Sequence, residues 1–446
     1  MRERQYDAAV IGGGPAGVCA AIAAARTGAR TLLVEEGGCL GGMATKGLVG
    51  PFMTSYDKSG KNQIIKGLFD EIVRRLVKIG GAIHPSFCRA GSSFTAWHFL
   101  GHDHVTPFDP EQLKFVLDQM CAEAGVDVLL HTVFTGLAMD GKRIAGVHLY
   151  NKSGALEIGA TVFVDATGDG DVAFRAGVPF EQGDPERQGA MQPATLFFRI
   201  AGLKESDLEA DLKSHGHDHT GTVRNFSWYV DAAKAAGEWD LPRPHINIYR
   251  QVRDDEWFVN VSRLNGVDGT DAVSLSRAEA DGRRQVQMIM NVFRKYFPGG
   301  ENVRLLSTAS TVGIRETRHI CGEYRITTDD IVHGRVPPDS IACCAYAMDV
   351  HGGNGADKTL MLAIQEGGYY GIPYRSLVPL KIDNLLVAGR CICGSSLASG
   401  SFRVMPPAMA TGEAAGTAAA LCVKAEVAPR ELNVSSLRAR LDLPEG

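Results

Sequence analysis

Side chains that could bind an anion gather in the stretch GIRETRHICGEYR, which runs from Gly313 to Arg325. Arg315 belongs to this stretch, and Arg403 lies in the later stretch GSFRVMPP. A guanidinium group is a planar fork that suits carboxylates and other flat acceptors. His351 is a candidate general acid or base, because its ordinary pKa lies near neutrality, and the alternative is a histidine whose hydrogen bonds are satisfied by the backbone of its loop. We therefore expect Arg315, Arg403 and His351 to take part in the chemistry.

Several kinds of anion could bind to these arginines: a nucleic acid backbone, a phosphate, a carboxylate substrate or a developing charge on a cofactor. The net charge of −5 disfavours nucleic acid, because such binders usually show a basic excess. Glu316 and Glu323 could instead pair with the arginines in a purely structural ion network. Alternation along an extended strand would place Arg315 and His319 on one face and Glu316 on the other.

Two runs of histidine raise the question of a metal site. They are WHFLGHDH and HGHDH, with imidazoles at His98, His102, His104, His215, His217 and His219. Alternating histidines on a strand could share a metal ion. The glycine and aspartate within the second run are more typical of a solvated loop, so we predict no metal.

The composition is that of an ordinary globular protein with 446 residues, 45% of them apolar and 22% charged. Ten cysteines are scattered along the chain without a CxxC pair, which is typical of a reducing compartment. The N-terminus passes from charged residues into a predicted strand without a signal-peptide pattern. No apolar run is long enough to span a membrane. We therefore expect a cytoplasmic protein without a membrane or nucleic acid partner.

A dinucleotide-binding fingerprint opens the chain in YDAAVIGGGPAGVCAAIAAARTGARTLLVEEGG. A short buried strand leads to Gly12, Gly14 and Gly17, and a helix of small residues follows. Gly12 permits a tight turn, Gly14 lets a pyrophosphate approach the backbone, and Gly17 lets the helix pack on the strand. A second strand ends at Glu35, where a carboxylate can hold ribose hydroxyls. Strand, glycines, helix, strand and acid in this order predict a bound dinucleotide.

Other segments have clear local signals. FDPEQLKFVLDQMCAEAGVDVLL (108–130) predicts a helix that begins with Asp109 as its cap and Pro110 at its first position. Residues 131–164 alternate apolar and polar side chains between turns, which predicts a β-meander. A long amphipathic helix is expected over roughly 274–297, and a further helix after Pro406 and Pro407.

Three longer stretches then identify a family. They are EGGCLGGMATKGLVGP after Glu35, ATVFVDATGDGDVAFRAG (160–177) and DNLLVAGRCICGSSLASGSFRVMPPAMATGEAAGTAAALC (383–422). Together they resemble FAD-dependent oxidoreductases of the two-dinucleotide-binding-domain superfamily. The nearest resemblance is to a bacterial family of FAD-dependent oxidoreductases distantly akin to the fumarate reductase flavoproteins.

This resemblance implies an α/β fold, with a discontinuous Rossmann-like FAD-binding domain (1–190 and 355–446) and an inserted α+β substrate domain (191–354). It implies that FAD is the cofactor. The further residues that it places against FAD are Pro15, Ala16, Glu36, Gly42, Met43, Ala44, Thr45, Val133, Gly168, Asp169, Gly389, Arg390, Val404 and Met405. Val133 would meet the adenine, and the loop at Gly42–Thr45 would run beside the flavin ring.

The resemblance also bears on how FAD is held. The loop CLGGMATKG has no histidine for a covalent flavin linkage, so non-covalent FAD is expected. Cys39 is the alternative attachment point, although a packed loop cysteine is the simpler interpretation. We expect Arg403 to serve the flavin and Arg315 the substrate.

The reaction implied is hydride transfer between FAD and a small organic substrate, which the arginines suggest is anionic. No second GxGxxG occurs between residues 150 and 350, so a separate NAD(P)H domain is not expected. Electrons would then come from the substrate or from a partner protein. Two alternatives stay open: a flavoprotein subunit that passes electrons to an acceptor protein, and a flavin enzyme without net redox chemistry.

Overall fold

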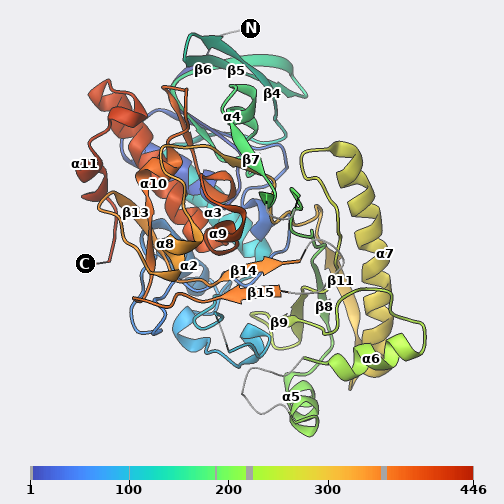
Figure 1. Ribbon diagram of the computed structural model, residues 1–446. Helices are drawn as coiled ribbons and strands as arrows, with labels where there is room; N and C mark the ends of the chain where they lie inside the picture. The colour runs from blue at the N-terminus through green and yellow to red at the C-terminus, as the bar shows by residue number, and fades with distance from the viewer. Residues whose placement is uncertain (1–3, 100, 186–187, 217–224, 353–358, 445–446) are drawn as a thin grey trace.

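The computed structural model describes residues 4–99, 101–185, 188–216, 225–352 and 359–444. Within these ranges an α/β body lies beside a smaller body built on a second sheet (Figure 1). The strands are β1 (Arg4–Ile11), β2 (Thr31–Val34), β3 (Asp127–Leu129), β4 (Val133–Asp140), β5 (Arg143–Asn151), β6 (Gly154–Asp165), β7 (Phe180–Gln182), β8 (Phe198–Ala201), β9 (Ile248–Arg250), β10 (Glu256–Val259), β11 (Arg304–Thr308), β12 (Arg318–Ile320), β13 (Ser340–Cys344), β14 (Met348–His351), β15 (Thr359–Leu362), β16 (Tyr370–Pro373) and β17 (Leu385–Val387). The α-helices are α1 (Pro15–Arg26), α2 (Gly67–Lys78), α3 (Pro110–Ala124), α4 (Asp171–Arg175), α5 (Glu205–Ser214), α6 (Ser227–Ala235), α7 (Ala272–Tyr296), α8 (Thr328–Val332), α9 (Ser396–Phe402), α10 (Met405–Ala425) and α11 (Val434–Arg438).

The main sheet of the larger body has the strand order β3-β2-β1-β6-β5-β4, and β17 pairs with β6. Strands β1, β2, β3, β6 and β17 pair in parallel, whereas β4, β5 and β6 form an antiparallel meander. The first part of β6 pairs with β5 and its last part with β17. This arrangement confirms the predicted α/β, Rossmann-like fold and the β-meander.

Helices α1 and α10 cross with their backbones in contact, because their facing residues are small. A Cβ atom added to Gly412 would lie 2.0 Å from the carbonyl oxygen of Ala16, and one added to Gly416 would lie 1.9 Å from that of Ala20. Only glycine fits at this crossing. α10 thereby fixes the start of α1, where the dinucleotide fingerprint lies.

Local capping signals decide where several helices begin. The Asp109 side chain accepts a hydrogen bond from the backbone N–H of Glu111 at 2.8 Å, and Pro110 is the first residue of α3. α7 begins after Asp271, whose side chain accepts from Ser274. The predicted helices at these places are confirmed, with α7 starting two residues earlier than expected.

The smaller body is built on a sheet with the order β11-β8-β10-β9, in which neighbouring strands are antiparallel. The long helix α7 runs alongside this sheet (Figure 1). Trp257 and Phe258 of β10 and Phe293 of α7 are fully buried in its core. This second body supplies one wall of the site described below.

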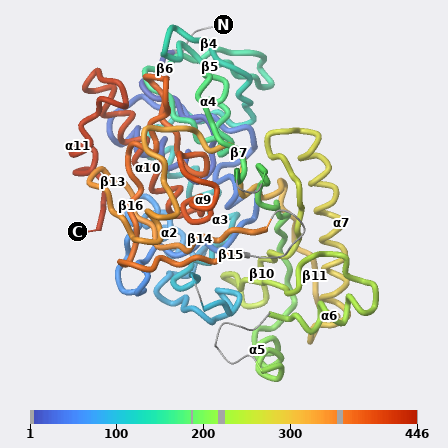
Figure 2. The backbone as a smooth tube through the Cα atoms, viewed as in Figure 1, coloured from blue at the N-terminus to red at the C-terminus, as the bar shows by residue number. Residues whose placement is uncertain are grey.

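Buried apolar side chains form two clusters. One contains residues of the larger body together with Ile320, Ile341 and other residues of the segment that follows the smaller body. The other holds residues 194–312 with Leu48, Ala96 and Trp97. Figure 2 shows β14 and β15 running between the two bodies. The predicted domain boundaries at 190 and 354 stay a prediction, and the segment around Ile320–Cys344 packs with the first cluster.

No helix in the described part of the chain has the length and hydropathy needed to cross a bilayer.

Candidate functional site

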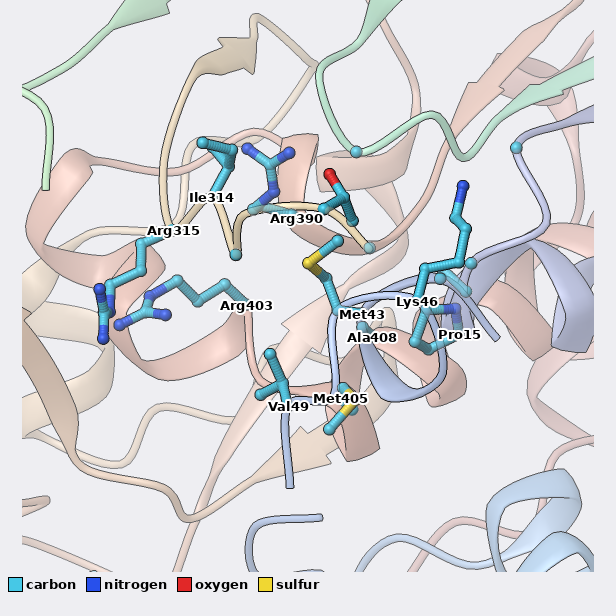
Figure 3. A pocket seen from close by; sticks show the side chains of 18 of the residues that line it. Pro15, Met43, Lys46, Val49, Ile314, Arg315, Arg390, Arg403, Met405 and Ala408 are labelled. Atoms are coloured by element: carbon cyan, nitrogen blue, oxygen red, sulfur yellow. The ribbon is translucent and has the colours of Figure 1, made fainter. Parts of the chain in front are cut away.

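A cavity of about 550 Å³ runs from the dinucleotide fingerprint to the predicted arginines. Gly12, Gly14 and Glu35 line one end, which we call the dinucleotide end. Arg315 and Arg403 line the other, which we call the arginine end. Figure 3 shows the labelled side chains spread along this cavity, with Lys46 and Pro15 far from Arg315.

The three fingerprint glycines have different surroundings at the dinucleotide end. Gly12 has φ +102°, and a Cβ added there would lie 2.4 Å from the carbonyl oxygen of Ala166. A Cβ on Gly17 would lie 1.7 Å from the carbonyl oxygen of Gly12. Gly14 has open space within 4 Å, and as the N-cap of α1 it supplies no side-chain cap. A pyrophosphate can therefore reach the uncapped N–H groups of α1, so the residues present fit a dinucleotide.

Glu35 is buried at the end of β2 and organises the loops around it. Its Oε2 accepts from the backbone N–H of Gly13 at 2.9 Å, and its Oε1 accepts from that of Gly37 at 2.7 Å. Lys46 Nζ lies 2.6 Å from Oε1 and 3.4 Å from Glu36 Oε1. Burial opposes the charge on Lys46, but Glu35 outweighs it and raises the pKa of Lys46. Lys46 was not predicted from the sequence.

The middle of the cavity is lined by residues that the resemblance assigned to FAD. Figure 3 shows Met43 and Met405 between Lys46 and Arg403. The other predicted residues that line the cavity are Pro15, Ala16, Glu36, Gly42, Val133, Gly168, Asp169, Gly389, Arg390 and Val404. The structure thus brings these segments together around one space.

A few of the predicted residues lie behind the cavity wall. Gly17 and Ala44 are buried away from its lining, and Thr45 donates from its hydroxyl to the carbonyl oxygen of Leu40 at 2.7 Å. Thr45 therefore holds the shape of the loop. Cys39 also lies outside the lining, and its Sγ is 3.9 Å from Thr45 Oγ1.

A charged network joins the segment that begins at Gly313 to the larger body. Asp169 Oδ1 accepts from Arg390 at 2.7 Å and from the Thr317 hydroxyl at 2.7 Å. Arg318 donates to the carbonyl oxygen of Asp169 at 3.0 Å and to Asp171 Oδ1 at 2.8 Å. Part of the arginine cluster is therefore a structural ion network.

The predicted alternation of side chains over residues 315–319 is wrong. His319 Nε2 lies 3.0 Å from Glu316 Oε1, although the two residues were placed on opposite faces. The physical reason is that β12 begins only at Arg318, and the preceding residues are not extended strand. Glu323 pairs with Arg430 at 3.0 Å rather than with the arginines of its own segment.

Two guanidinium groups face each other at the arginine end (Figure 3). Arg315 donates to the Thr195 hydroxyl at 2.7 Å and to the carbonyl oxygen of Pro193. Arg403 donates to the carbonyl oxygen of Asp349 at 2.9 Å. Neither arginine has a carboxylate within ion-pair distance in the described ranges. Burial, with Arg263 and Arg403 nearby, lowers the pKa of Arg315 well below its ordinary value.

An acid and a histidine lie beside the two arginines. Asp349 Oδ2 is 3.3 Å from His351 Nε2 and 3.5 Å from the Tyr346 hydroxyl. Burial would raise the pKa of Asp349, but His351, Arg403 and Arg315 together lower it. Burial lowers the pKa of His351 to about 3, although Asp349 opposes this. The pair therefore holds an ionised carboxylate and a neutral imidazole at neutral pH.

Gln192 links these groups. Its Oε1 accepts from the backbone N–H of His351 at 3.2 Å and lies 3.5 Å from an Arg403 nitrogen. Its backbone N–H donates to Glu316 at 3.2 Å. Gln192, Asp349 and Tyr346 were missed by sequence reasoning. The spacing of Asp349 and His351 was a usable signal, because residues two apart on a strand share a face.

The histidines of the two runs lie in different surroundings. His102 lines the cavity, and its ring centroid lies 6.4 Å from that of Tyr249. His104 Nδ1 lies 3.0 Å from the carbonyl oxygen of Pro85. His217 and His219 lie outside the described residues. No group of three or more histidine, cysteine or acidic side chains in the described ranges is arranged to hold a metal ion.

Comparisons with known proteins bear on the family of the chain. A search of curated proteins gives no match. Among solved structures, p-nitrophenol 4-monooxygenase from Pseudomonas putida DLL-E4 is 11% identical and has a TM-score of 0.50, over 96% of this chain and 83% of that chain. L-proline dehydrogenase from P. horikoshii is 13% identical with a TM-score of 0.43, over 97% and 96% of the two chains. At 11% identity, the likeness to the monooxygenase bears on the fold alone. The model of the FAD dependent oxidoreductase family matches residues 7–441, so the chain belongs to that family and uses FAD.

Proposed function

We propose that this FAD-dependent oxidoreductase transfers a hydride between a small anionic organic substrate and non-covalently held FAD. The observation that supports it is the arginine end of the cavity. Arg315 and Arg403 lie there with no carboxylate within ion-pair distance in the described part of the chain. Both groups donate hydrogen bonds to neutral acceptors, and neither is in direct contact with a carboxylate of the described residues. Buried charges are stabilised by an opposite charge, so two guanidinium groups facing one cavity favour an anionic ligand.

The dinucleotide end would hold the adenosine and pyrophosphate of FAD. Glu35 would take ribose hydroxyls, Gly14 would admit the pyrophosphate, and Val133 would contact the adenine. Met43 and Met405 would flank the flavin ring in the middle of the cavity. The predicted roles of the other lining residues belong to the same proposal.

The arginine end would bind and orient the substrate. A carboxylate can accept parallel N–H donors from a guanidinium fork, which fixes both its position and its plane. Bound FAD would supply a two-electron oxidant that accepts the hydride. The substrate breaks one C–H bond, and it also loses a proton. His351, neutral at physiological pH, is the proposed first acceptor of that proton, with Asp349 stabilising the resulting imidazolium. Because the pKa of His351 is lowered, the imidazolium would pass the proton on to solvent.

Non-covalent attachment of FAD is supported by the loop after Glu35. This loop holds no histidine, and Cys39 lies outside the cavity lining. Acid precipitation of the purified protein should release FAD into the supernatant. Yellow colour that stays with the pellet would contradict non-covalent attachment.

The reaction is tested by mixing the oxidised protein anaerobically with small carboxylates. Loss of the oxidised flavin absorbance with one of them, and a large loss of apparent affinity in Arg315→Met, is the expected result. Met keeps most of the apolar stem and removes the charge. Arg375→Met is a matched control, because Arg375 pairs with Asp339 outside the cavity.

Other outcomes would support the alternative functions. Reduction that requires a partner protein would favour an electron-transferring subunit. Turnover only after prior reduction, with the flavin left reduced, would favour chemistry without net redox. A sulfite titration separates the roles of the two arginines. If Arg403 serves the flavin as predicted, Arg403→Met should weaken the sulfite adduct, whereas Arg315→Met should leave it intact.

A further inference from the structure

Asp349 lies at the arginine end with an incomplete set of hydrogen bonds. Its Oδ2 contacts His351 and Tyr346, as described above. Its Oδ1 receives no hydrogen bond from any residue in the described ranges, yet the side chain lines the cavity and is 19% exposed. An ionised carboxylate can accept about four hydrogen bonds, so Oδ1 has capacity for a donor from a ligand.

The position of Asp349 relative to the arginines is the second observation. Arg403 donates to the backbone carbonyl of Asp349 and thereby ties the two residues together. Arg315 and Arg403 both act on the Asp349 carboxylate electrostatically. An acceptor thus stands next to a pair of donors within one cavity. A ligand that fits both must have an anionic group and a hydrogen-bond donor a short distance apart.

We propose that the substrate is a small carboxylate with a hydroxyl or amino group on the adjacent carbon, and that Asp349 binds this group. The inference depends on the proposed function, since the arginines would bind the carboxylate of the same molecule. A hydroxyl group and an amino group can each donate this hydrogen bond to Asp349. Asp349 would orient the carbon that bears the donor, and His351 would hold the Asp349 carboxylate from its other side.

The charges of the site are compatible with either source. Arg315 and Arg403 contribute two positive charges and Asp349 one negative charge, while His351 is neutral. A hydroxy acid brings one negative charge and balances these four side chains, with Arg263 adding a further positive charge near Arg315. An amino acid brings a carboxylate for the arginines and an ammonium for Asp349, so each charged group of the ligand meets its opposite.

Binding of matched compounds to the oxidised holoenzyme tests the inference without turnover. The probes are 2-hydroxy-2-methylpropanoate, 2-amino-2-methylpropanoate and 2,2-dimethylpropanoate. They differ only in a hydroxyl, an amino or a methyl group, and none has a hydrogen on the carbon next to the carboxylate. Binding is followed by titration calorimetry and by the change in flavin absorbance.

We expect one donor-bearing probe to bind about tenfold or more tightly than the methyl probe, as a hydrogen bond to a charged group typically gives. The hydroxyl and amino arms identify which donor the site prefers. Asp349→Ala should abolish that preference, while the methyl probe binds as well or more tightly because a negative charge has gone. Asp349→Asn, which keeps the shape and a neutral acceptor, should give an intermediate preference if Asp349→Ala does not fold.

Failure of this inference can be told from failure of the proposed function. Equal binding of the three probes, or a preference that survives in Asp349→Ala, would overturn the role of Asp349. If Arg315→Met still weakens all three probes in that case, the proposed carboxylate site stands. Absence of binding by every probe overturns the substrate class. Asp339→Asn, a change at an acid outside the cavity, serves as the control and should match the wild type.

Discussion

The two ends of the cavity are built in different ways. At the dinucleotide end the important atoms are mostly backbone atoms of consecutive residues, from Gly12 to Gly17, with Glu35 as the main side chain. At the arginine end they are side-chain atoms from segments far apart in sequence, such as Arg315, Asp349 and Arg403. The first kind of site depends on close packing that only glycine allows, and the second on charges that must be brought together by the whole fold.

The largest effect is expected where the dinucleotide end allows no side chain. In Gly17→Ala the new Cβ would lie 1.7 Å from the carbonyl oxygen of Gly12, so α1 must move away from β1. Overpacking of this kind typically costs roughly 1–3 kcal/mol. We expect apoprotein with a lower Tm that retains no FAD through gel filtration.

Gly14→Ala is the matched control for Gly17→Ala. Gly14 has φ −71°, which alanine adopts freely, and there is nothing within 4 Å of its added Cβ. The apoprotein should therefore keep its Tm, while the methyl group blocks the approach of the pyrophosphate and FAD affinity falls. Equal loss of Tm in both variants would show that the glycines serve packing alone.

The contrast between the ends explains what the sequence could predict. Gly12, Gly14, Gly17 and Glu35 were found because a fixed local spacing encodes a strand, a turn and a helix start. The Rossmann-like sheet, the meander and the capped helices follow from equally local signals.

The arginine end has no such local pattern. Arg315 and Arg403 were noticed by residue type, but their proximity depends on how residues 88 positions apart meet in the fold. Gln192 and Tyr346 had no signal of their own, because ordinary polar residues become part of a site only through packing. The error over residues 315–319 has a related cause. The Thr317 hydroxyl donates to the distant Asp169 and His319 contacts the nearby Glu316, so these interactions, rather than strand alternation, set the side-chain directions.

A smaller effect on FAD is expected at Glu35. Glu35→Gln replaces one carboxylate oxygen by an amide nitrogen, which cannot accept from the N–H of Gly13 or Gly37. It also removes the charge available to the ribose hydroxyls. Loss of a hydrogen bond to a charged group predicts an FAD dissociation constant about ten- to a hundredfold higher. Fluorescence titration of the apoprotein measures it, and an unchanged constant would show that another residue holds the ribose.

At the arginine end we expect an effect on how the free energy of unfolding depends on pH. The pKa of His351 is lowered from 6.5 to about 3 in the folded protein. The unfolded chain then binds one more proton than the folded chain between these values. Stability should rise with pH across this window and be fully present above it, with a slope of about 1.4 kcal/mol per pH unit for one proton. In His351→Gln the free energy of unfolding should rise less steeply with pH in this window, because one titrating group has gone. Urea unfolding at several pH values measures this slope. An identical slope in both proteins would contradict a buried neutral His351.

The smallest effect is expected for Lys46, where the two kinds of site construction meet. Lys46 is a side chain at the dinucleotide end, and its Nζ lies 2.6 Å from Glu35 Oε1 with the side chain 18% exposed. If it only orients Glu35, Lys46→Met should raise the FAD dissociation constant a few-fold, since a partly exposed ion pair contributes up to about 1 kcal/mol. The same change made in Glu35→Gln should then add nothing, because the pair is already broken. Lys46→Arg should restore most of the affinity. If the two changes raise the FAD dissociation constant additively, and if that constant depends strongly on salt, Lys46 contacts the phosphates of FAD directly. The dinucleotide end would then depend on a side-chain charge, as the arginine end does.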